Sequence, residues 1–391
     1  MAAKRKKNVE KMVARLLREG LENQVFPGAA VGIVAGPVGH GKTWFITEGC
    51  TSFLAERSAV DKATVFDLAS LTKPLATTLA VLCLLRDRRL SLASGLAALL
   101  GQAVPADKDA ITLRQLLCHQ AGLPAHREFY KKFHEFDREA TGPAMLAMVL
   151  AEPLEHPPGR RTVYSDLGFL LLGWAVERLA GQRLDHFVRE RIYAPMGLCD
   201  HLFFVPTAER VGHGATIFAC TENCPWRQRV LCGEVSDDNA WVLGGVAGQA
   251  GLFGDIVGVT TLVGHILDQW QGREEPCAYD GDTLRSFLRR PEGTEAGARA
   301  LGFDTPAPTG SSGGALISPA SVGHLGFTGT SFWMDPERDA AVVLLTNRVH
   351  PSRENELIKE FRPRLHDAVW SMLDTGEAEA QRHKGTKGQR P

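Results

Sequence analysis

The amino-acid sequence predicts an α/β domain that is interrupted by a domain made mainly of helices. The apolar spacing of helices dominates the middle of the chain. We expect residues 1–66 and 241–375 to form the sheet domain, and residues 67–240 to form the helical domain with the loops around a site. Strand-like runs lie near both ends of the chain, at residues 29–35, 43–53, 323–336 and 339–347.

The composition is that of a soluble globular protein. The 391 residues suffice for a large core and two subdomains. Apolar residues make up 44% of the chain and charged residues 23%, which are ordinary values. A net charge of −1 does not indicate nucleic acid or an anionic membrane as a partner. No apolar run approaches membrane-spanning length, and no partner protein is predicted.

The beginning of the chain does not have the pattern of a signal peptide. The basic residues MAAKRKK precede an amphipathic helix rather than a continuous apolar stretch. We therefore expect a cytoplasmic protein whose eight cysteines are reduced. Cys220 and Cys224 form a close pair near His213, but no second ligand pair with zinc spacing accompanies them. We expect buried or half-buried thiols here and no metal site.

The segment GPVGHGKT, residues 36–43, matches the phosphate-loop pattern at every fixed position. A phosphate loop must open a helix, because the helix N-terminus binds the phosphates. The residues that follow, TWFITEGCTSF, are rich in aromatic and β-branched types, which favour a strand. We expect a turn between two strands rather than a nucleotide site.

The remaining elements are predicted from the spacing of apolar residues and from glycine and proline residues that end helices. Residues 242–254 are too rich in glycine for a stable element, and residues 335–339 supply a turn between the two late strand-like runs. Residues 376–391 are polar and are expected to form a disordered tail. Helices are expected at residues 70–86 and 111–124, in two pieces of 164–197 broken at Ala180–Gly181, at 257–270, and at 353–373 with an irregularity at Pro363.

Ser70 and Lys73 are the first candidates for chemistry. On a helix, residues three apart share a face, so the Lys73 amine can reach the Ser70 hydroxyl. A serine becomes a good nucleophile when a neighbouring base takes its proton, and a lysine whose pKa is lowered can be that base. The Ser70 N–H at a helix start can also stabilise an oxyanion. The alternative is a helix cap beside a solvated lysine.

Two further elements strengthen this interpretation. Tyr164 lies just before a strongly helical run, and its hydroxyl can relay or accept the serine proton. The alternative is a half-buried aromatic next to a helix cap made by Ser165 or Asp166. His324 and Gly326 share one face of a late strand, where a glycine lets a substrate lie close to an edge strand.

The three elements, in this order, resemble the penicillin-recognising serine hydrolases, in the branch of class C β-lactamases, D-Ala-D-Ala carboxypeptidases and family VIII esterases. The family pattern S-x-x-K matches Ser70 and Lys73, Y-x-N matches Tyr164 and Asp166, and K/H-T-G matches His324 to Gly326. Further similar segments extend the resemblance over about residues 25 to 365. It implies a β-lactamase/transpeptidase-like fold, with an antiparallel sheet flanked by the N- and C-terminal helices and an inserted all-α domain.

The resemblance also implies a mechanism that needs no cofactor or metal. Ser70 attacks a carbonyl, Lys73 and Tyr164 handle its proton, and water hydrolyses the acyl-enzyme. The N–H groups of Ser70 and Phe327 form the oxyanion hole. Which of Lys73 and Tyr164 is the base stays open, because the two titrate together.

Three departures from the family pattern affect the residues expected to bind substrate. Asp166 places a carboxylate where the family has an amide, and Leu325 lacks the usual hydroxyl. Gln249 stands where relatives often have histidine. The segment FTG, residues 327–329, is an alternative match to K-T-G, but His324 keeps the chemistry of the first position. The departures at Asp166 and Leu325 weaken the case for penicillinase or carboxypeptidase activity.

Two other patterns are interpreted as structural. Ser312 fits G-x-S-x-G, but its surroundings have the composition of a loop rather than the strand and helix of a nucleophile elbow. His119 is expected to be a structural histidine beside a helix end.

The leading hypothesis for the function of the protein is a hydrolase of a small ester or amide. The alternatives are a peptidoglycan-related carboxypeptidase or β-lactamase, and a catalytically silent relative that binds a ligand.

Overall fold

A five-stranded antiparallel sheet is the centre of the computed structural model, which describes residues 2–133, 138–207, 216–273, 277–290 and 299–385. Its strand order is β2-β1-β10-β9-β8, so the first strand of the chain pairs with the last. This pairing confirms the predicted sheet built from both ends of the sequence. The strands are β1 Gly28–Ala35, β2 Lys42–Gly49, β8 Val322–Leu325, β9 Ser331–Asp335 and β10 Ala340–Thr346.

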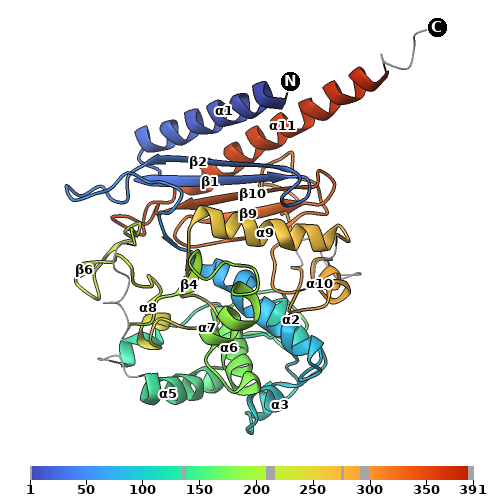
Figure 1. Ribbon diagram of the computed structural model, residues 1–391. Helices are drawn as coiled ribbons and strands as arrows, with labels where there is room; N and C mark the ends of the chain where they lie inside the picture. The colour runs from blue at the N-terminus through green and yellow to red at the C-terminus, as the bar shows by residue number, and fades with distance from the viewer. Residues whose placement is uncertain (1, 134–137, 208–215, 274–276, 291–298, 386–391) are drawn as a thin grey trace.

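Helices cover both faces of this sheet (Figure 1). The terminal helices α1, Ala2–Glu22, and α11, Ile358–Gly385, lie on one face, and α9, Ile256–Trp270, lies on the other. Alternation along β1 separates the two cores, because Val31 packs with the terminal helices while Ala30 packs into the larger core that contains α9. The flanking helices of the predicted fold are thereby confirmed.

The phosphate-loop match is a hairpin. Residues 36–41 connect β1 to β2, with Ala35 paired to Lys42 and Val34 paired to Thr43. The Gly36 N–H donates to the Asp339 carbonyl rather than facing an anion. Lys42 therefore begins a strand, as expected, and no helix follows the loop.

The helical region lies beyond α9 (Figure 1) and contains the segment that carries Ser70. That segment begins as the 3₁₀ turn η1 Ala69–Leu71, continues as the π-helix η2 Lys73–Thr78 and ends as α2 Leu79–Arg86. The sequence predicted one regular helix here, whereas the segment starts as a 3₁₀ turn and a π-helix, with Pro74 in the first turn of η2, where its missing N–H is tolerated. The other helices of this region are α3 Leu96–Leu100, α4 Leu113–Leu117, α5 Arg138–Ala151, α6 Asp166–Ala180, α7 Leu184–Val188 and α8 Asp238–Val242.

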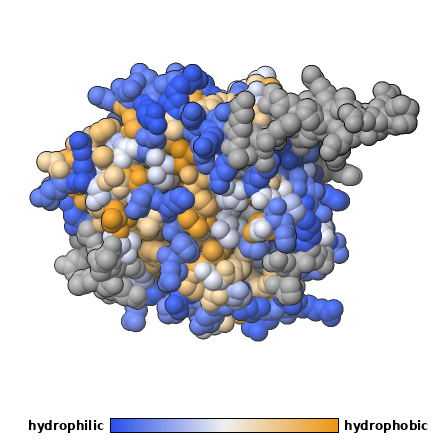
Figure 2. Space-filling model, turned by 45° about the horizontal axis from the view of Figure 1, so that its top comes forward, coloured by the Kyte–Doolittle hydropathy of each residue, from blue (hydrophilic) through white to orange (hydrophobic). Residues whose placement is uncertain are grey.

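By length and composition, residues Ala69–Arg86 are apolar enough to cross a membrane. The expectation that no run approaches that length is therefore wrong for this segment. Within the fold, however, 83% of the stretch is buried, as in the core helix of a globular protein. On the face shown in Figure 2, apolar patches are interspersed with hydrophilic surface.

Shorter elements connect these layers. A three-stranded sheet of order β3-β7-β4 joins Phe66–Asp67, Leu252–Gly254 and Leu202–Phe204, and thereby links the segment before Ser70 to the loop after α8. The remaining elements are the hairpin β5 Asn223–Cys224 with β6 Arg229–Val230, α10 Gly281–Phe287, the 3₁₀ turns η3 Ala106–Lys108 and η4 Phe129–Lys132, and the π-helix η5 Arg189–Tyr193.

Two predicted boundaries differ from the structure. Residues 323–336 contain two strands, β8 and β9, because residues 326–330 make a tight turn in which Gly329 has a φ of 103°. Helix α11 begins at Ile358 and extends to Gly385, beyond the expected start of a disordered tail. Residues 376–385 are rich in glutamate, alanine and other good helix formers. The end of the predicted tail, residues 386–391, lies outside the described residues, and the division into domains stays a prediction.

Candidate active site

Ser70 is placed by a strained backbone at the end of β3. Ala69, which precedes it, has a φ of 48°, in the left-handed region that costs energy for a residue with a side chain. The Asp67 Oδ1 atom accepts the Ala69 N–H at 2.8 Å and stabilises this conformation. Asp67 Oδ2 also accepts the Ser236 N–H at 2.7 Å. Asp67 therefore joins the nucleophile segment to the loop before α8.

Lys73 lies beneath Ser70, and its side chain is fully buried. An ammonium group has three N–H donors, and each has a partner here. Lys73 Nζ donates to Ser70 Oγ at 3.0 Å, to Asp166 Oδ1 at 2.8 Å and to the Gln249 carbonyl at 3.0 Å. The predicted contact between serine and lysine is confirmed.

Charge, rather than burial, decides the ionisation of this lysine. Burial alone would lower the Lys73 pKa, but the Asp166 carboxylate and the Tyr164 hydroxyl outweigh that effect and raise it. Burial likewise opposes ionisation of Asp166, yet the Lys73 cation and the bond to His126 hold its pKa well below the usual range. The resting site thus contains an ammonium–carboxylate pair, and the lowered lysine pKa that the sequence interpretation invoked is not present.

Tyr164 lies at the start of α6, beside the Lys73 ammonium. The Lys73 nitrogen is 4.9 Å from the centre of the Tyr164 ring. The expected helix cap is made by Ser165, whose hydroxyl accepts the Gly168 N–H at 3.3 Å. His119 packs on the tyrosine ring, and its Nδ1 accepts the Ser165 N–H at 3.0 Å. His119 thus has the structural role that was expected of it.

The edge strand β8 brings His324 and Leu325 to the same site. The His324 side chain is buried, and its Nδ1 donates to the Leu325 carbonyl at 2.9 Å. Burial, followed by the nearby Lys73 and Arg299 cations, lowers the His324 pKa well below its usual value. His324 is therefore neutral and does not supply the positive charge of a lysine.

Gly326 follows this strand and fulfils a packing requirement that differs from the one expected. A Cβ at this position would collide with the Thr330 hydroxyl and with the Leu68 carbonyl. The glycine therefore lets the strand end pack against the backbone before Ser70. Phe327 is 49% exposed in the turn that follows, and its N–H donates no hydrogen bond within the described residues. His324, rather than Phe327, lies on the strand, in agreement with the preferred match.

Gln249 contributes its backbone more than its side chain. The side chain is 1% exposed, does not line the cavity at Ser70 and donates to Asp237 Oδ1 at 3.2 Å. The Gln249 carbonyl accepts from Lys73, and the preceding Gly248 carbonyl accepts from the Thr77 hydroxyl at 2.7 Å. A direct role for the Gln249 side chain in substrate binding is therefore not supported by its placement.

These residues converge on a cavity of about 750 Å³. The segments around residues 126–130 and 236–239 contribute to it, although residues 134–137 and 208–215 lie outside the described part of the chain. The predicted residues that line it are Ser70, Tyr164, Asp166, His324, Leu325, Gly326 and Phe327. They are joined by residues in and around η4 and α8, namely His126, Glu128, Tyr130, Ser236, Asp237, Asp238 and Asn239.

Two functional candidates were missed by the sequence interpretation. His126 Nδ1 lies 3.1 Å from Asp166 Oδ2, and its side chain is 45% exposed in the cavity. The Arg299 guanidinium lies 4.8 Å from the centre of the Tyr164 ring and pairs with Asp304. Both residues belong to loops without periodic pattern, so the sequence contains no local signal for them.

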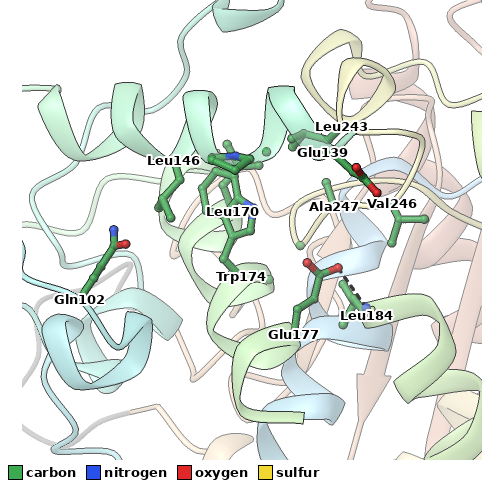
Figure 3. A pocket seen from close by; sticks show the side chains of 14 residues that line it. Gln102, Glu139, Leu146, Leu170, Trp174, Glu177, Leu184, Leu243, Val246 and Ala247 are labelled. Atoms are coloured by element: carbon green, nitrogen blue, oxygen red, sulfur yellow. Dashed lines mark hydrogen bonds between the residues drawn. The ribbon is translucent and has the colours of Figure 1, made fainter. Parts of the chain in front are cut away.

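A second cavity of about 590 Å³ is adjacent to residues 243–251, the loop between α8 and β7 that contains Gln249 (Figure 3). Its wall is mainly apolar, with Leu170 and Trp174 of α6 facing Val246 and Ala247. The Glu177 carboxylate at this cavity accepts the Leu184 N–H at 3.1 Å. The lining residues contain no serine, cysteine or lysine, so of these two cavities the one at Ser70 is equipped for nucleophilic chemistry.

The surroundings of Cys220 and Ser312 do not fit a metal site or a nucleophile elbow. Cys220 Sγ lies 2.7 Å from Cys232 Sγ rather than beside Cys224, and His213 is outside the described residues. Within the described ranges, no group of three or more metal-binding side chains gathers. Ser312 lies in a turn between irregular segments, so the strand and helix of a nucleophile elbow are absent around it.

Comparison with known proteins agrees with this geometry. The family model described as Beta-lactamase matches residues 13–362. A curated protein of Salmonella agona (strain SL483), named "Putative D-alanyl-D-alanine carboxypeptidase", is 32% identical over 324 residues. The aligned part is 77% of this chain and 73% of that protein.

Two solved structures share the fold at low sequence identity. EstCE1, described as a hydrolase with promiscuous acyltransferase activity, has a TM-score of 0.73 and 19% identity over 93% of this chain and 99% of its own. A class C beta lactamase has a TM-score of 0.70 and 15% identity over 93% of this chain and 98% of its own. The architecture is therefore the β-lactamase/transpeptidase-like fold that the sequence predicted.

Proposed function

The chain belongs to the beta-lactamase family, and we propose that it hydrolyses a small ester or amide through an acyl-enzyme on Ser70. The observation that carries the proposal is the 3.0 Å hydrogen bond between Lys73 Nζ and Ser70 Oγ, at the floor of a cavity lined by Tyr164. A hydroxyl beside a cation and a phenol, in a cavity large enough for a small acyl substrate, is equipped for nucleophilic catalysis.

Acylation begins when Ser70 Oγ attacks the substrate carbonyl carbon. The Lys73 ammonium donates all three of its N–H groups and has no lone pair, so it cannot take the serine proton in that state. The proton passes to Tyr164 once its phenol has lost a proton, or to Lys73 once Lys73 has lost one, and then to the leaving group. The cationic Lys73 meanwhile stabilises the negative charge that develops on Ser70 Oγ.

The oxyanion hole is proposed to consist of the Ser70 and Phe327 N–H groups. The Phe327 N–H supports this assignment, because it has no partner among the described residues and follows the edge strand in the wall of the same cavity. Two N–H donors aimed at the carbonyl oxygen stabilise the tetrahedral intermediate.

The cytoplasmic location expected from the sequence stays a prediction.

A carboxypeptidase acting on peptides with a free carboxylate is the second candidate. Four arginines line the cavity, Arg299, Arg348, Arg353 and Arg362, and a guanidinium binds a carboxylate well. The name of the Salmonella agona relative also favours this activity. The guanidinium groups already have partners, however, since Arg353 pairs with Glu222, and Arg362 donates to the Gly326 carbonyl at 2.9 Å. We therefore place ester or amide hydrolysis first.

The test is turnover of p-nitrophenyl butyrate by the wild-type chain and by Ser70→Ala. We expect saturable hydrolysis by the wild type and none above background by Ser70→Ala, with the same circular dichroism spectrum for both. Equal hydrolysis by the two folded proteins would exclude Ser70 as the nucleophile. Substitution of D-alanyl-D-alanine peptides for the ester distinguishes the second candidate by release of D-alanine.

A further inference from the structure

His126 ends a continuous chain of hydrogen bonds that starts at the nucleophile. Ser70 Oγ accepts from Lys73 Nζ at 3.0 Å, and Lys73 Nζ donates to Asp166 Oδ1 at 2.8 Å. The other oxygen of the same carboxylate, Asp166 Oδ2, lies 3.1 Å from His126 Nδ1. Ser70 and His126 line the same cavity, so both ends of the chain face the same space.

The carboxylate fixes the tautomer of this histidine. The Lys73 cation keeps Asp166 ionised, and an ionised carboxylate accepts hydrogen bonds but donates none. His126 Nδ1 must therefore carry the hydrogen, and in the neutral ring Nε2 has a free lone pair. Within the described residues Nε2 makes no hydrogen bond, and the His126 side chain is 45% exposed. Its lone pair is open to water in the cavity.

We propose that His126 is the general base that activates water for hydrolysis of the acyl-enzyme, with Asp166 as its positioning residue. A carboxylate that orients an imidazole against a reacting hydroxyl is a recurrent arrangement in nucleophilic catalysis. Lys73 is not free for this task, because its ammonium has three partners and no lone pair. The inference rests on the proposed function, since it requires an acyl group on Ser70.

The proposed step balances in protons and bonds. Water attacks the acyl carbonyl carbon while His126 Nε2 takes one of its protons, and the C–O bond to Ser70 Oγ then breaks. Ser70 Oγ takes a proton from Lys73, and the Nδ1 proton of His126 passes through Asp166 to Lys73. The carboxylic acid leaves, and proton exchange with water at the exposed imidazole restores the starting tautomer.

The charges around His126 give the step a defined dependence on pH. The hydrogen bond to Asp166 raises the His126 pKa against the effect of burial, and the charges of Asp237, Asp166 and Glu128 act in the same direction. The protonated ring cannot act as a base, so deacylation slows as pH falls through that pKa. Asp166→Asn removes the largest cause of the raised His126 pKa. We therefore expect the acidic limb of the pH profile of the deacylation rate to move to lower pH.

The experiment separates deacylation from acylation. Wild type, His126→Ala and His126→Gln are acylated with p-nitrophenyl butyrate, passed rapidly through gel filtration and sampled by intact-protein mass. We expect one butyryl group on Ser70 in each histidine variant, lost about 100-fold or more slowly than from wild type, as for loss of a general base. Added imidazole should restore the rate in His126→Ala. His186→Ala is the matched control, because that exposed histidine also lies beside a carboxylate, Asp185, at 3.9 Å.

The outcomes distinguish this inference from the proposed function. If the His126 variants hydrolyse the ester at the wild-type rate without accumulating an adduct, the inference is wrong while the Ser70 mechanism stands. Equal slowing of acylation and deacylation, without rescue by imidazole, assigns His126 a structural role and also overturns it. If no protein turns over the ester or gains an adduct, the proposed function fails, and the inference fails with it.

Discussion

The Lys73 ammonium nitrogen lies 2.8 Å from Asp166 Oδ1, at the position where the family pattern has an asparagine. The Lys73 side chain is fully buried and the Asp166 side chain is 20% exposed, so the pair is largely screened from water. Its attraction raises the Lys73 pKa and lowers that of Asp166. The substitution therefore couples the lysine charge to His126, instead of presenting an amide to the substrate.

Replacement of this carboxylate should change the preference for penicillins. We expect Asp166→Asn to acylate faster with benzylpenicillin than wild type does, because an amide can contact the β-lactam carbonyl without a negative charge. The rate of penicilloyl adduct formation, followed by intact-protein mass, measures the effect. An Asp166→Asn protein that is folded and active on p-nitrophenyl butyrate, but gains nothing with penicillin, would contradict this explanation.

The pKa of the buried Asp67 carboxyl is raised to about 6, mainly by burial. Its ionised form therefore costs stability above pH 6, and the cost is relieved as pH falls from 6 toward the unfolded value of about 4. A shift of about two units corresponds to about 3 kcal/mol at most. In urea unfolding, the free energy of unfolding of the wild type should therefore rise between pH 7 and pH 4.5 by more than that of Asp67→Asn. Parallel changes in wild type and variant would contradict the assignment.

Lys73→Ala should slow the acylation of Ser70. The variant loses the cation next to Ser70 and the proton route through it, so we expect inactivation by a fluorophosphonate to slow by about 10²- to 10⁴-fold. The second-order rate constant of inactivation measures this. Lys42→Ala is the matched control, because it removes an exposed lysine from the β2 end of the hairpin.

The hairpin also predicts the absence of nucleotide binding at residues 36–43. Mg-ATP should not change the midpoint of thermal unfolding of the wild type or of Lys42→Ala. The reason is that residues 36–41 connect two strands and open no helix. Stabilisation of the wild type by Mg-ATP that is lost in Lys42→Ala would show that the hairpin interpretation is wrong.

The sheet and the nucleophile could be predicted because their signals are local. The β1–β2 hairpin follows from β-branched and aromatic runs around a glycine-rich turn, and the contact between Ser70 and Lys73 follows from helical spacing. The turn that separates β8 from β9 was missed, since residues 326–330 read as part of one continuous strand. The length of α11 was underestimated because a polar composition was given more weight than helix propensity.

The charges of the site could not be predicted in the same way. His126 and Asp166 are 40 positions apart in sequence and meet because the loop before η4 packs on the start of α6. Arg299 reaches Tyr164 from another loop, again with no periodic pattern to indicate it. The raised Lys73 pKa depends on these contacts between distant segments, whereas the sequence interpretation considered burial and neighbouring cations.

The central claim is that Ser70 is an activated nucleophile. The most direct measurement is the intact-protein mass of wild type and Ser70→Ala after exposure to a fluorophosphonate. We predict a single adduct on the wild type, located at Ser70 by peptide mapping, and none on Ser70→Ala. Folded wild-type protein without an adduct, or an equal adduct on Ser70→Ala, would contradict the account.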